Sequence, residues 1–367
     1  MSGRTTMPRR QRGIAMLVAI MLVALGTIIA AAVAYESAMT ARRGTATLSF
    51  DEALLVGEGA EALAAYGLKA VMQSSKPGTT GGSTSPDVFP AQPWAQPVGP
   101  LEVVPGTTLE ASLEDMQGRF NLNWLVVDPA TNPFGGSTGS GANPGALPGT
   151  NIINRVGGGV PAGAAQPAAN AGAIRAFNKL LQLVGIEPKW ADMLVDWIDA
   201  DNIPQPQGAE DSAYLGQNPP YLTANRYLTS TSELLALPGF GRENFAKLAP
   251  YISALPPGTP LNICSAPAPV LDAFSSQTTF VNDVAGLAKN RENPAACFPD
   301  LKSYTQQILD ANDLQLAGSG RFVTTSSYFR LSSLVTIGTT EFNLYSLLYM
   351  ESPAYLIHPV QRSFSPD

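Results

Sequence analysis

The stretch IAMLVAIMLVALGTIIAAAVAY, residues 14–35, decides the architecture of this chain. It contains no charged residue, and ~20 apolar residues are enough to cross a bilayer as a helix. The residues before it carry four arginines and no acid: Arg4, Arg9, Arg10 and Arg12. Because a basic flank stays on the cytoplasmic side, we expect the rest of the chain to lie across the membrane.

The apolar segment differs from a cleaved secretory signal in its length and in its C-terminal flank. A cleaved signal has an apolar region of roughly 7–15 residues with a small-x-small site after it. Here residues 30–32, all alanine, fall inside the apolar run. The basic leader ends at Gly13 and therefore resembles a type IV prepilin signal, which is cleaved on the cytoplasmic face and leaves the helix on the mature protein. We expect cleavage between Gly13 and Ile14, with an uncleaved anchor as the alternative.

One position departs from the usual pilin pattern. Pilins and major pseudopilins usually carry glutamate at the fifth mature position, where it neutralises the amino terminus of a neighbouring subunit. That position is Val18 here. A carboxylate inside a bilayer costs several kcal/mol unless it is paired, so its absence has physical meaning. A subunit without it can start a filament but makes a poor repeating unit.

The composition favours a loop-rich protein outside the cytoplasm. Charged residues make up only 14% of the 367 residues, and the chain has 34 glycines and 31 prolines. This combination is not typical of a cytosolic enzyme. The formal net charge is −7, and it becomes about −11 without the four leader arginines. A chain of this sign has no general electrostatic attraction to nucleic acid.

The two cysteines, Cys264 and Cys297, both lie beyond the apolar segment. An oxidising periplasm permits a disulfide between them, and two free thiols are the alternative. The bridge would close a loop of about 33 residues and stabilise the fold by ~3 kcal/mol on the chain-entropy model. Neither Cys-x-x-Cys nor metal-site spacing is present, so the expected role is structural.

The chain after the apolar segment first continues as an amphipathic helix over residues 36–73. Residues 74–100 have a loop composition, a strand pair is expected over 108–114 and 120–127, and 129–171 form a long Gly/Pro-rich loop. Helical periodicity dominates residues 172–256, with helices expected from Ile174, Trp190, Ser232 and Glu243. A final β-hairpin is expected over residues 322–337 and 341–350. The fold class is therefore α+β.

An acidic cluster between residues 196 and 211 is the main candidate for binding chemistry. Asp199 and Asp201 follow the end of a predicted helix, and a Pro-rich loop can fold Glu210 and Asp211 back toward them. Several carboxylate oxygens on one loop suit Ca²⁺, which takes 6–8 oxygen ligands. Helix capping plus solvated acids is the alternative, and a family resemblance is needed to favour calcium.

The sequence gives little support to nucleic-acid binding or to catalysis. Residues 234–241 look like a helix-hairpin-helix turn, but residues 172–256 carry six bases and nine acids, which favours a packing hairpin over nucleic-acid binding. His358 is the only histidine, no Gly-x-Ser-x-Gly elbow is expected at a strand-to-helix turn, and no Walker A loop or Gly-x-Gly-x-x-Gly after a strand occurs. We therefore expect a protein that is not an enzyme.

Four stretches together resemble protein K of type II secretion systems, a minor pseudopilin family. They are the Gly13/Ile14 junction without a mature fifth glutamate, residues 118–123, the block 196–214, and residues 232–240. Residues 261–266 resemble an Asn-rich element of the family, with Cys264 and Ser265 in place of more usual polar residues. The resemblance spans nearly the whole chain and depends on the order of the motifs.

The resemblance implies a pilin-like fold: a long N-terminal transmembrane helix plus an antiparallel sheet, with a large inserted α-helical domain. The implied divisions are a leader (1–13), a transmembrane helix (14–35), a stalk helix (36–73), the first part of a pilin-like head (74–171), the inserted domain (172–256) and the second part of the head (257–367). It also implies calcium sites, which transfer only to Asp199, Asp201, Glu210 and Asp211, and N-methylation of Ile14 after cleavage by a prepilin peptidase.

The implied function is a non-enzymatic tip subunit that initiates or caps a periplasmic pseudopilus. Its implied partners are the minor pseudopilins I and J, the major pseudopilin, and the secretin or secreted proteins. The implied location is the inner membrane of a Gram-negative bacterium, with a single span and a periplasmic head. A membrane-anchored periplasmic binding protein or hydrolase is one alternative, and a minor tip pilin of a type IV pilus is another.

Overall fold

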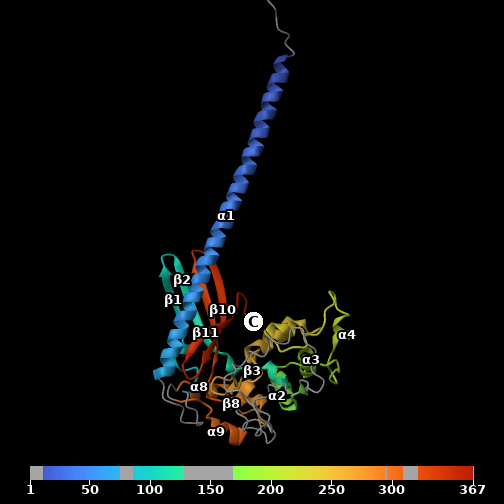
Figure 1. Ribbon diagram of the computed structural model, residues 1–367, viewed down its shortest axis with the longest axis vertical. Coiled ribbons are helices and arrows are strands. Elements are labelled where there is room, and N and C mark those ends of the chain that lie inside the picture. The colour runs from blue at the N-terminus through green and yellow to red at the C-terminus, as the bar shows by residue number, and fades with distance from the viewer. Residues whose placement is uncertain (1–10, 75–85, 128–167, 294–295, 309–320, 367) are drawn as a thin grey trace, which may run out of the picture.

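The computed structural model describes residues 11–74, 86–127, 168–293, 296–308 and 321–366. Its first element is the helix α1, Gln11–Ser74, which runs unbroken for 64 residues. The N-terminal half of α1 projects away from the rest of the protein, and the C-terminal half lies along a sheet (Figure 1). The predicted transmembrane and stalk segments are therefore one continuous helix. The predicted leader 1–13 lies mostly outside the described residues.

The sheet has five antiparallel strands in the order β1-β2-β9-β10-β11. Their bounds are Val98–Val104, Thr107–Asp115, Tyr328–Ile337, Thr340–Glu351 and Leu356–Ser363. Alternate residues of β10 are buried against α1, as expected for a strand with one covered face. A Cβ at Gly57 of α1 would lie 2.7 Å from Leu344 Cδ2, so glycine allows the helix to approach β10 closely.

A hydrophobic core forms between α1 and the sheet, and we call these elements the sheet unit. Its buried residues are Ala53, Ala60, Leu68, Met72, Val88, Trp94, Leu109, Phe329, Leu331, Val335, Leu348 and Met350. The short 3₁₀ helix η1, Pro93–Ala95, places Trp94 edge-on against Phe329, with ring centroids 5.3 Å apart. This core fixes the stalk end of α1 to the sheet, which confirms the expected mixed α+β fold.

The predicted C-terminal hairpin is present as β9 and β10, which turn at Gly338 with a φ of 61°. Its first strand begins at Tyr328, later than the predicted residue 322, because Phe322 and Val323 pair with Leu261 and Asn262 instead. The next strand, β11, was missed. Its sequence contains Pro359, which stands opposite Leu348 beside a register shift. Proline removes a ladder donor and is tolerated at the edge of a sheet, so the strand lacks the usual sequence signal.

The predicted strand over 120–127 is wrong in detail. This stretch divides into β3 (Phe120–Asn121), the 3₁₀ helix η3 (Leu122–Leu125) and β4 (Val126–Val127). Asn123 causes the break, because its Nδ2 donates to the carbonyls of Leu228 (3.0 Å) and Leu255 (2.8 Å). The segment is therefore buried inside a second core instead of pairing in the large sheet.

That second core belongs to what we call the helical unit, which comprises the described residues between 116 and 323. Its longer helices are α2 (Ala171–Leu183), α3 (Lys189–Ile198), α5 (Gly241–Leu248) and α8 (Val284–Arg291). Its shorter helices are α4 (Asp211–Tyr214), α6 (Ala268–Ala273), α7 (Thr279–Asn282) and α9 (Leu301–Ser303), together with η2 (Met116–Gly118), η5 (Thr231–Ala236), η6 (Ala249–Tyr251) and the π-helix η7 (Tyr304–Ile308). Its remaining strands are β5 (Ala168–Ala169), β6 (Ile252–Ser253), β7 (Leu261–Asn262) and β8 (Phe322–Val323).

The boundary between the two units differs from the predicted one at residue 256. A row of aromatic rings runs through the helical unit, with Phe120 stacked on Phe177 and Phe274, and Phe274 edge-on to Phe322. The described residues between 257 and 323 therefore pack with the helices and not with the large sheet. The chain rejoins the sheet unit only from about residue 324.

A buried polar junction joins the two units at the end of β2. Asp115 Oδ2 accepts hydrogen bonds from Asn262 Nδ2 (2.8 Å) and Ser326 Oγ (2.7 Å), and Asp115 Oδ1 accepts one from Gln117 N (2.9 Å). Burial raises the pKa of Asp115, while these donors oppose the rise. The carboxylate thus ties β2, β7 and the start of β9 together.

Candidate metal centre and membrane helix

The N-terminal half of α1 has the properties of a membrane span. Within the described residues, one helix is long and apolar enough to cross a membrane, and it covers Ile14–Ser74 with a mean hydropathy of 2.8 in its most apolar window. None of that window is buried in the protein. Large apolar side chains from Ile14 to Tyr35 are exposed, including Val18 at 50%. The helix is consistent with a single-pass membrane anchor.

The acidic cluster forms where α3 ends. Asp199 is the residue after α3, and its backbone N–H still donates to Val195 O (2.9 Å). One oxygen from each of Asp199, Asp201 and Glu210 lies within 4.8 Å of the others. Asp199 is 2% exposed and Glu210 is 7% exposed, whereas Asp201 is half-buried. Three of the four predicted ligands therefore come together.

The fourth predicted ligand, Asp211, lies outside this three-residue group. Its Oδ1 accepts hydrogen bonds from Thr223 N (3.0 Å) and Thr223 Oγ1 (2.7 Å). Asp211 also begins the short helix α4, directly after Glu210. Its contacts thus hold the chain immediately beyond Glu210.

Asp196 organises the loop that brings Glu210 back toward Asp199. Asp196 is fully buried, and its Oδ1 accepts a hydrogen bond from Gln205 N (3.0 Å). A Cβ at residue 208 would lie 1.8 Å from Asp196 Oδ2, so only Gly208 fits the loop there. Sequence reasoning placed Asp196 in the cluster without giving it this role. The Gly208-Ala209-Glu210 run was the available signal.

The cluster has the electrostatics of a cation site. Burial raises the pKa of Asp199 to about 7, with Asp201 and Asp196 adding repulsion. Burial, and then the surrounding carboxylates, likewise raises the pKa of Glu210 to about 7. Asp199 Oδ1 and both Glu210 carboxylate oxygens are shielded from solvent and accept no hydrogen bond from the described residues. Buried oxygens without a partner are costly, and a hard divalent cation would satisfy them.

Cys264 and Cys297 form a disulfide, with their Cα atoms 5.2 Å apart. Arg291, at the end of α8, binds the two chain segments that flank this disulfide. Its Nη2 donates to the carbonyls of Ile263 (2.9 Å) and Ala266 (2.8 Å), and its Nε donates to Phe298 O (2.9 Å). No motif in the sequence indicated this role, because the carbonyls that it binds belong to the backbone.

The candidate helix-hairpin-helix turn joins η5 to α5. Gly239 and Gly241 have φ values of 84° and 73°, which suit glycine. Phe240 between them is buried and lies edge-on to Trp190, with ring centroids 5.2 Å apart. The turn before α5 therefore packs against α3.

An apolar helix that continues into a sheet-packed stalk, together with a large helical unit, is the architecture of a pilin-like subunit with a candidate membrane anchor. A sequence model of the family "Type II secretion system (T2SS), protein K" matches residues 118–257. The type II secretion system protein K of Dickeya chrysanthemi is 30% identical over 259 residues, which cover 68% of each chain. The chain belongs to the type II secretion system protein K family.

Longer alignments extend this relationship. Protein K of Pseudomonas aeruginosa is 27% identical over 338 residues, covering 90% of this chain and 86% of the relative. Protein K of Pectobacterium carotovorum is 27% identical over 366 residues, covering 98% of each. A crystal structure of the GspK-GspI-GspJ complex from enterotoxigenic Escherichia coli matches with a TM-score of 0.64 at 20% identity, covering 89% of this chain and all of that chain. This structural match shows that the fold is shared.

Proposed function

We propose that this minor pseudopilin occupies the tip of a pseudopilus and initiates or caps its assembly. The position of the helical unit carries the proposal. It lies at the end of the molecule opposite the exposed apolar half of α1 (Figure 1). Filament subunits stack through their N-terminal helices, so a large body at the far end would obstruct a subunit added above it. Val18 in place of glutamate fits a subunit that has no predecessor.

In this proposal the head lies in the periplasm and α1 lies in the inner membrane of a Gram-negative bacterium. Prepilin peptidase removes residues 1–13, and Ile14 becomes the methylated N-terminus. Proteins I and J are the proposed partners, supported by the GspI and GspJ chains named with the structural neighbour. The apolar surface of α1 would pack against partner helices once it leaves the bilayer. The proposed role is to assemble the filament, without catalysing a reaction.

A calcium ion bound by Asp199, Asp201 and Glu210 would serve this role structurally. The donor set is all oxygen, and three of its carboxylate atoms have no other described partner. When bound, the ion would supply positive charge that the buried acids need. The residues would thereby fix the loop from 199 to 210 at the surface of the helical unit. Asp211 would contribute by holding the chain after Glu210.

The test is co-expression of the full chain with protein I, protein J and the major pseudopilin of the same organism. We expect a complex with one copy each of proteins I, J and K by native mass spectrometry. Immunogold labelling of pseudopili should mark one end of each filament. Labelling along the whole filament would overturn the tip assignment, and failure to associate with proteins I and J would overturn the partner assignment.

A further inference from the structure

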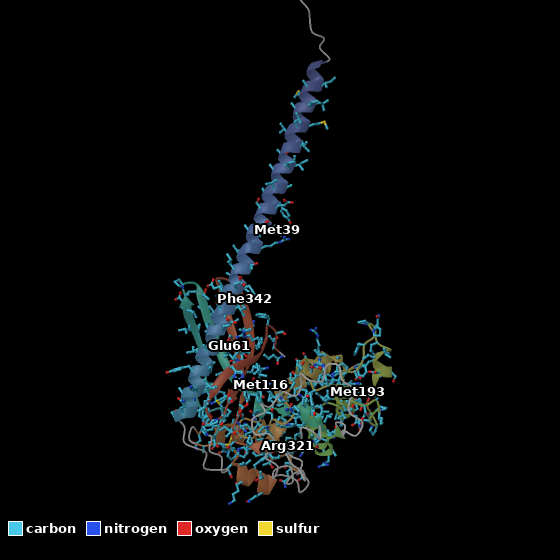
Figure 2. The ribbon with its side chains drawn as sticks, viewed as in Figure 1. Met39, Glu61, Met116, Met193, Arg321 and Phe342 are labelled. Atoms are coloured by element: carbon cyan, nitrogen blue, oxygen red, sulfur yellow. A yellow bond between two sulfur atoms is a disulfide. The ribbon has the colours of Figure 1, made fainter. Side chains whose placement is uncertain are left out.

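A turn over residues 262–266, which we call the junction turn, lies at the buried polar junction between the two units. It packs directly against η2, because a Cβ at Gly118 would lie 2.8 Å from the carbonyl carbon and oxygen of Ser265. Figure 2 places Met116, the first residue of η2, between the two units. The junction turn is therefore seated where the chain passes from β2 into the helical unit.

The side chain of Asn262 reaches from the junction turn into the sheet unit. Its Nδ2 donates to Val88 O (2.8 Å) and to Asp115 Oδ2 (2.8 Å). Asn262 is fully buried, and Val88 belongs to the core of the sheet unit. Asn262 Oδ1 accepts a hydrogen bond from Cys264 N (3.0 Å), and this bond fixes the direction in which the amide group points. The backbone of Cys264 thus orients the side chain that joins the two units.

The disulfide attaches this same residue to a second segment of the helical unit. Its partner, Cys297, follows α8, and both cysteines are buried. The bond closes a loop whose ends are 33 residues apart in sequence. Such a crosslink removes conformational freedom from the segments that it joins. The junction turn can therefore move only together with the segment around Cys297.

A buried cation bridges the same two segments. Arg291 donates to the carbonyls of Ile263 and Ala266 in the junction turn, and to the carbonyl of Phe298 beside the second cysteine. It forms no ion pair with the described residues, and burial lowers its pKa to about 10. Burying a charge without a counter-charge costs free energy. Arg291 therefore needs all three carbonyls in place, and the disulfide is the covalent link that keeps them together.

We propose that the bond between Cys264 and Cys297 is a redox-dependent lock on the junction between the two units. With the bond formed, the junction turn holds Asn262 in its contacts with Val88 and Asp115. With the bond reduced, the junction turn loosens and these contacts open, while each unit keeps its own hydrophobic core. The lock is a property of the fold and does not depend on the tip assignment.

The lock closes by thiol–disulfide exchange, with a protein or small-molecule disulfide as the oxidant. The thiolate of one cysteine attacks a sulfur of the oxidant, which forms a mixed disulfide and releases one thiolate. The thiolate of the other cysteine then attacks the mixed disulfide, which forms the internal bond and releases the second thiolate. The oxidant gains two electrons, and its two thiolates take up the two protons that the cysteines lose. The exchange requires an oxidising compartment such as the proposed periplasm.

The test is hydrogen–deuterium exchange of the full chain in detergent, measured by mass spectrometry. The chain is compared as oxidised, after reduction with a phosphine, and after reoxidation with glutathione disulfide. The reporting amides are Cys264 N, which donates to Asn262 Oδ1, and Val88 N, which donates to Thr324 O (2.7 Å). Reduction should speed their exchange about tenfold or more, and reoxidation should restore their protection. Unchanged protection in a chain shown by thiol titration to be reduced would overturn the proposal.

Two elements serve as internal references in the same measurement. The helix α2 lies in the helical unit and β10 lies in the sheet unit, so their amides report whether each unit stays folded. At labelling times short compared with global unfolding, the exchange of both should be unaffected by reduction. Equal acceleration of α2, β10 and the junction would overturn the proposal, because the disulfide would then stabilise the whole fold without any local effect.

A double-mutant cycle distinguishes a lock from a general crosslink. Asn262→Ala removes the contacts that the lock holds, so it should speed exchange at Val88 about as much as the double variant Cys264→Ala, Cys297→Ala. Combining all three substitutions should add little, because both changes act on one junction. Fully additive effects would contradict the proposal, since the disulfide would then act elsewhere.

A core truncation is the matched control for lost stability. Leu180→Ala shortens a fully buried side chain of α2, and its Tm can be compared with that of the double cysteine variant. It should lower the Tm without speeding exchange at the junction. Junction exchange that simply follows the Tm in all variants would overturn the lock. Reduction and reoxidation of the unaltered chain need no variant, so a folding defect in Asn262→Ala leaves the proposal falsifiable.

Discussion

Glu61 and Arg362 join the stalk helix to the last strand through two parallel hydrogen bonds. Arg362 Nε lies 2.8 Å from Glu61 Oε1, and Nη2 lies 2.7 Å from Oε2, across 301 residues of sequence. Glu61 is only 6% exposed and also accepts a hydrogen bond from Ser346. Figure 2 shows Glu61 on the part of α1 that lies beside the sheet. The pair therefore links α1 directly to β11, the last strand of the sheet unit.

Replacing Glu61 by glutamine should therefore destabilise the fold. Glutamine keeps the volume but cannot accept both bonds from Arg362, and we expect a loss of about 1–3 kcal/mol in the free energy of unfolding. Urea denaturation monitored by near-ultraviolet circular dichroism measures it. Glu58 is the matched control, because it lies 3.1 Å from the same arginine but is 41% exposed. Glu58→Gln should cost less than about 1 kcal/mol, and an equal cost for the two variants would contradict the role of burial.

Calcium should stabilise the chain through the acidic cluster. At a concentration 100-fold above Kd, one bound ion adds ~2.7 kcal/mol, which corresponds to a rise in Tm of roughly 5–10 °C. Differential scanning fluorimetry with calcium and with EDTA measures this rise. Asp199→Asn should abolish most of it, and Glu187→Gln, an exposed acid outside the cluster, should preserve it. A full calcium response in Asp199→Asn would exclude this cluster as the site.

Without calcium, the cluster should make stability fall as pH rises. The folded pKa values of Asp199 and Glu210 are about 7, whereas both groups ionise near pH 4 in an unfolded chain. Between these values the folded state binds more protons, so raising the pH from about 4 to 7 lowers the free energy of unfolding. The combined variant Asp199→Asn, Glu210→Gln should lose this contribution. Parallel pH profiles for wild type and variant would contradict the raised pKa values.

Processing at Gly13 remains a prediction, and it separates a pseudopilin from an uncleaved anchor. Mass spectrometry of the chain expressed with a prepilin peptidase should find Ile14 at the mature N-terminus, carrying a methyl group. Gly13→Leu should keep the leader intact. Gly26→Ala should be processed normally, because a Cβ at residue 26 meets nothing within 4 Å in the described part of the chain. Cleavage after the apolar run would overturn the prepilin interpretation.

The elements that sequence predicted well are those with local patterns. The apolar run and the amphipathic spacing after it predicted α1, apolar periodicity predicted α2 and α3, and strand alternation predicted the hairpin of β9 and β10. The failures come from contacts distant in sequence. Asn123 breaks the strand predicted over 120–127 by binding carbonyls more than a hundred residues away. The aromatic row that includes Phe322 likewise moves the unit boundary from 256 to about 323.

The candidate metal site was likewise predicted only in part from the sequence. The clustering of acids between residues 199 and 211 is visible in the sequence, but which acids meet depends on the path of the loop. Asp196 and Gly208 set that path, and Thr223 draws Asp211 away from the other three. The ion pairs of Glu114 with Arg119 and Arg330 had no sequence signal either, since Arg330 lies far from Glu114 in the chain and meets it only in the folded protein.

The placement of β9, β10 and β11 has a consequence for the order in which the two units can fold. All described core residues of the helical unit have been synthesised once the chain reaches residue 322. The apolar face of α1, by contrast, lacks its contacts with β9, β10 and β11 until residues 328–363 have been made. The stalk of a nascent chain therefore remains partly uncovered after the last core residue of the helical unit has been made. The contact between Glu61 and Arg362 can form only after the whole helical unit has been synthesised, so the sheet unit is the last part of the fold to close.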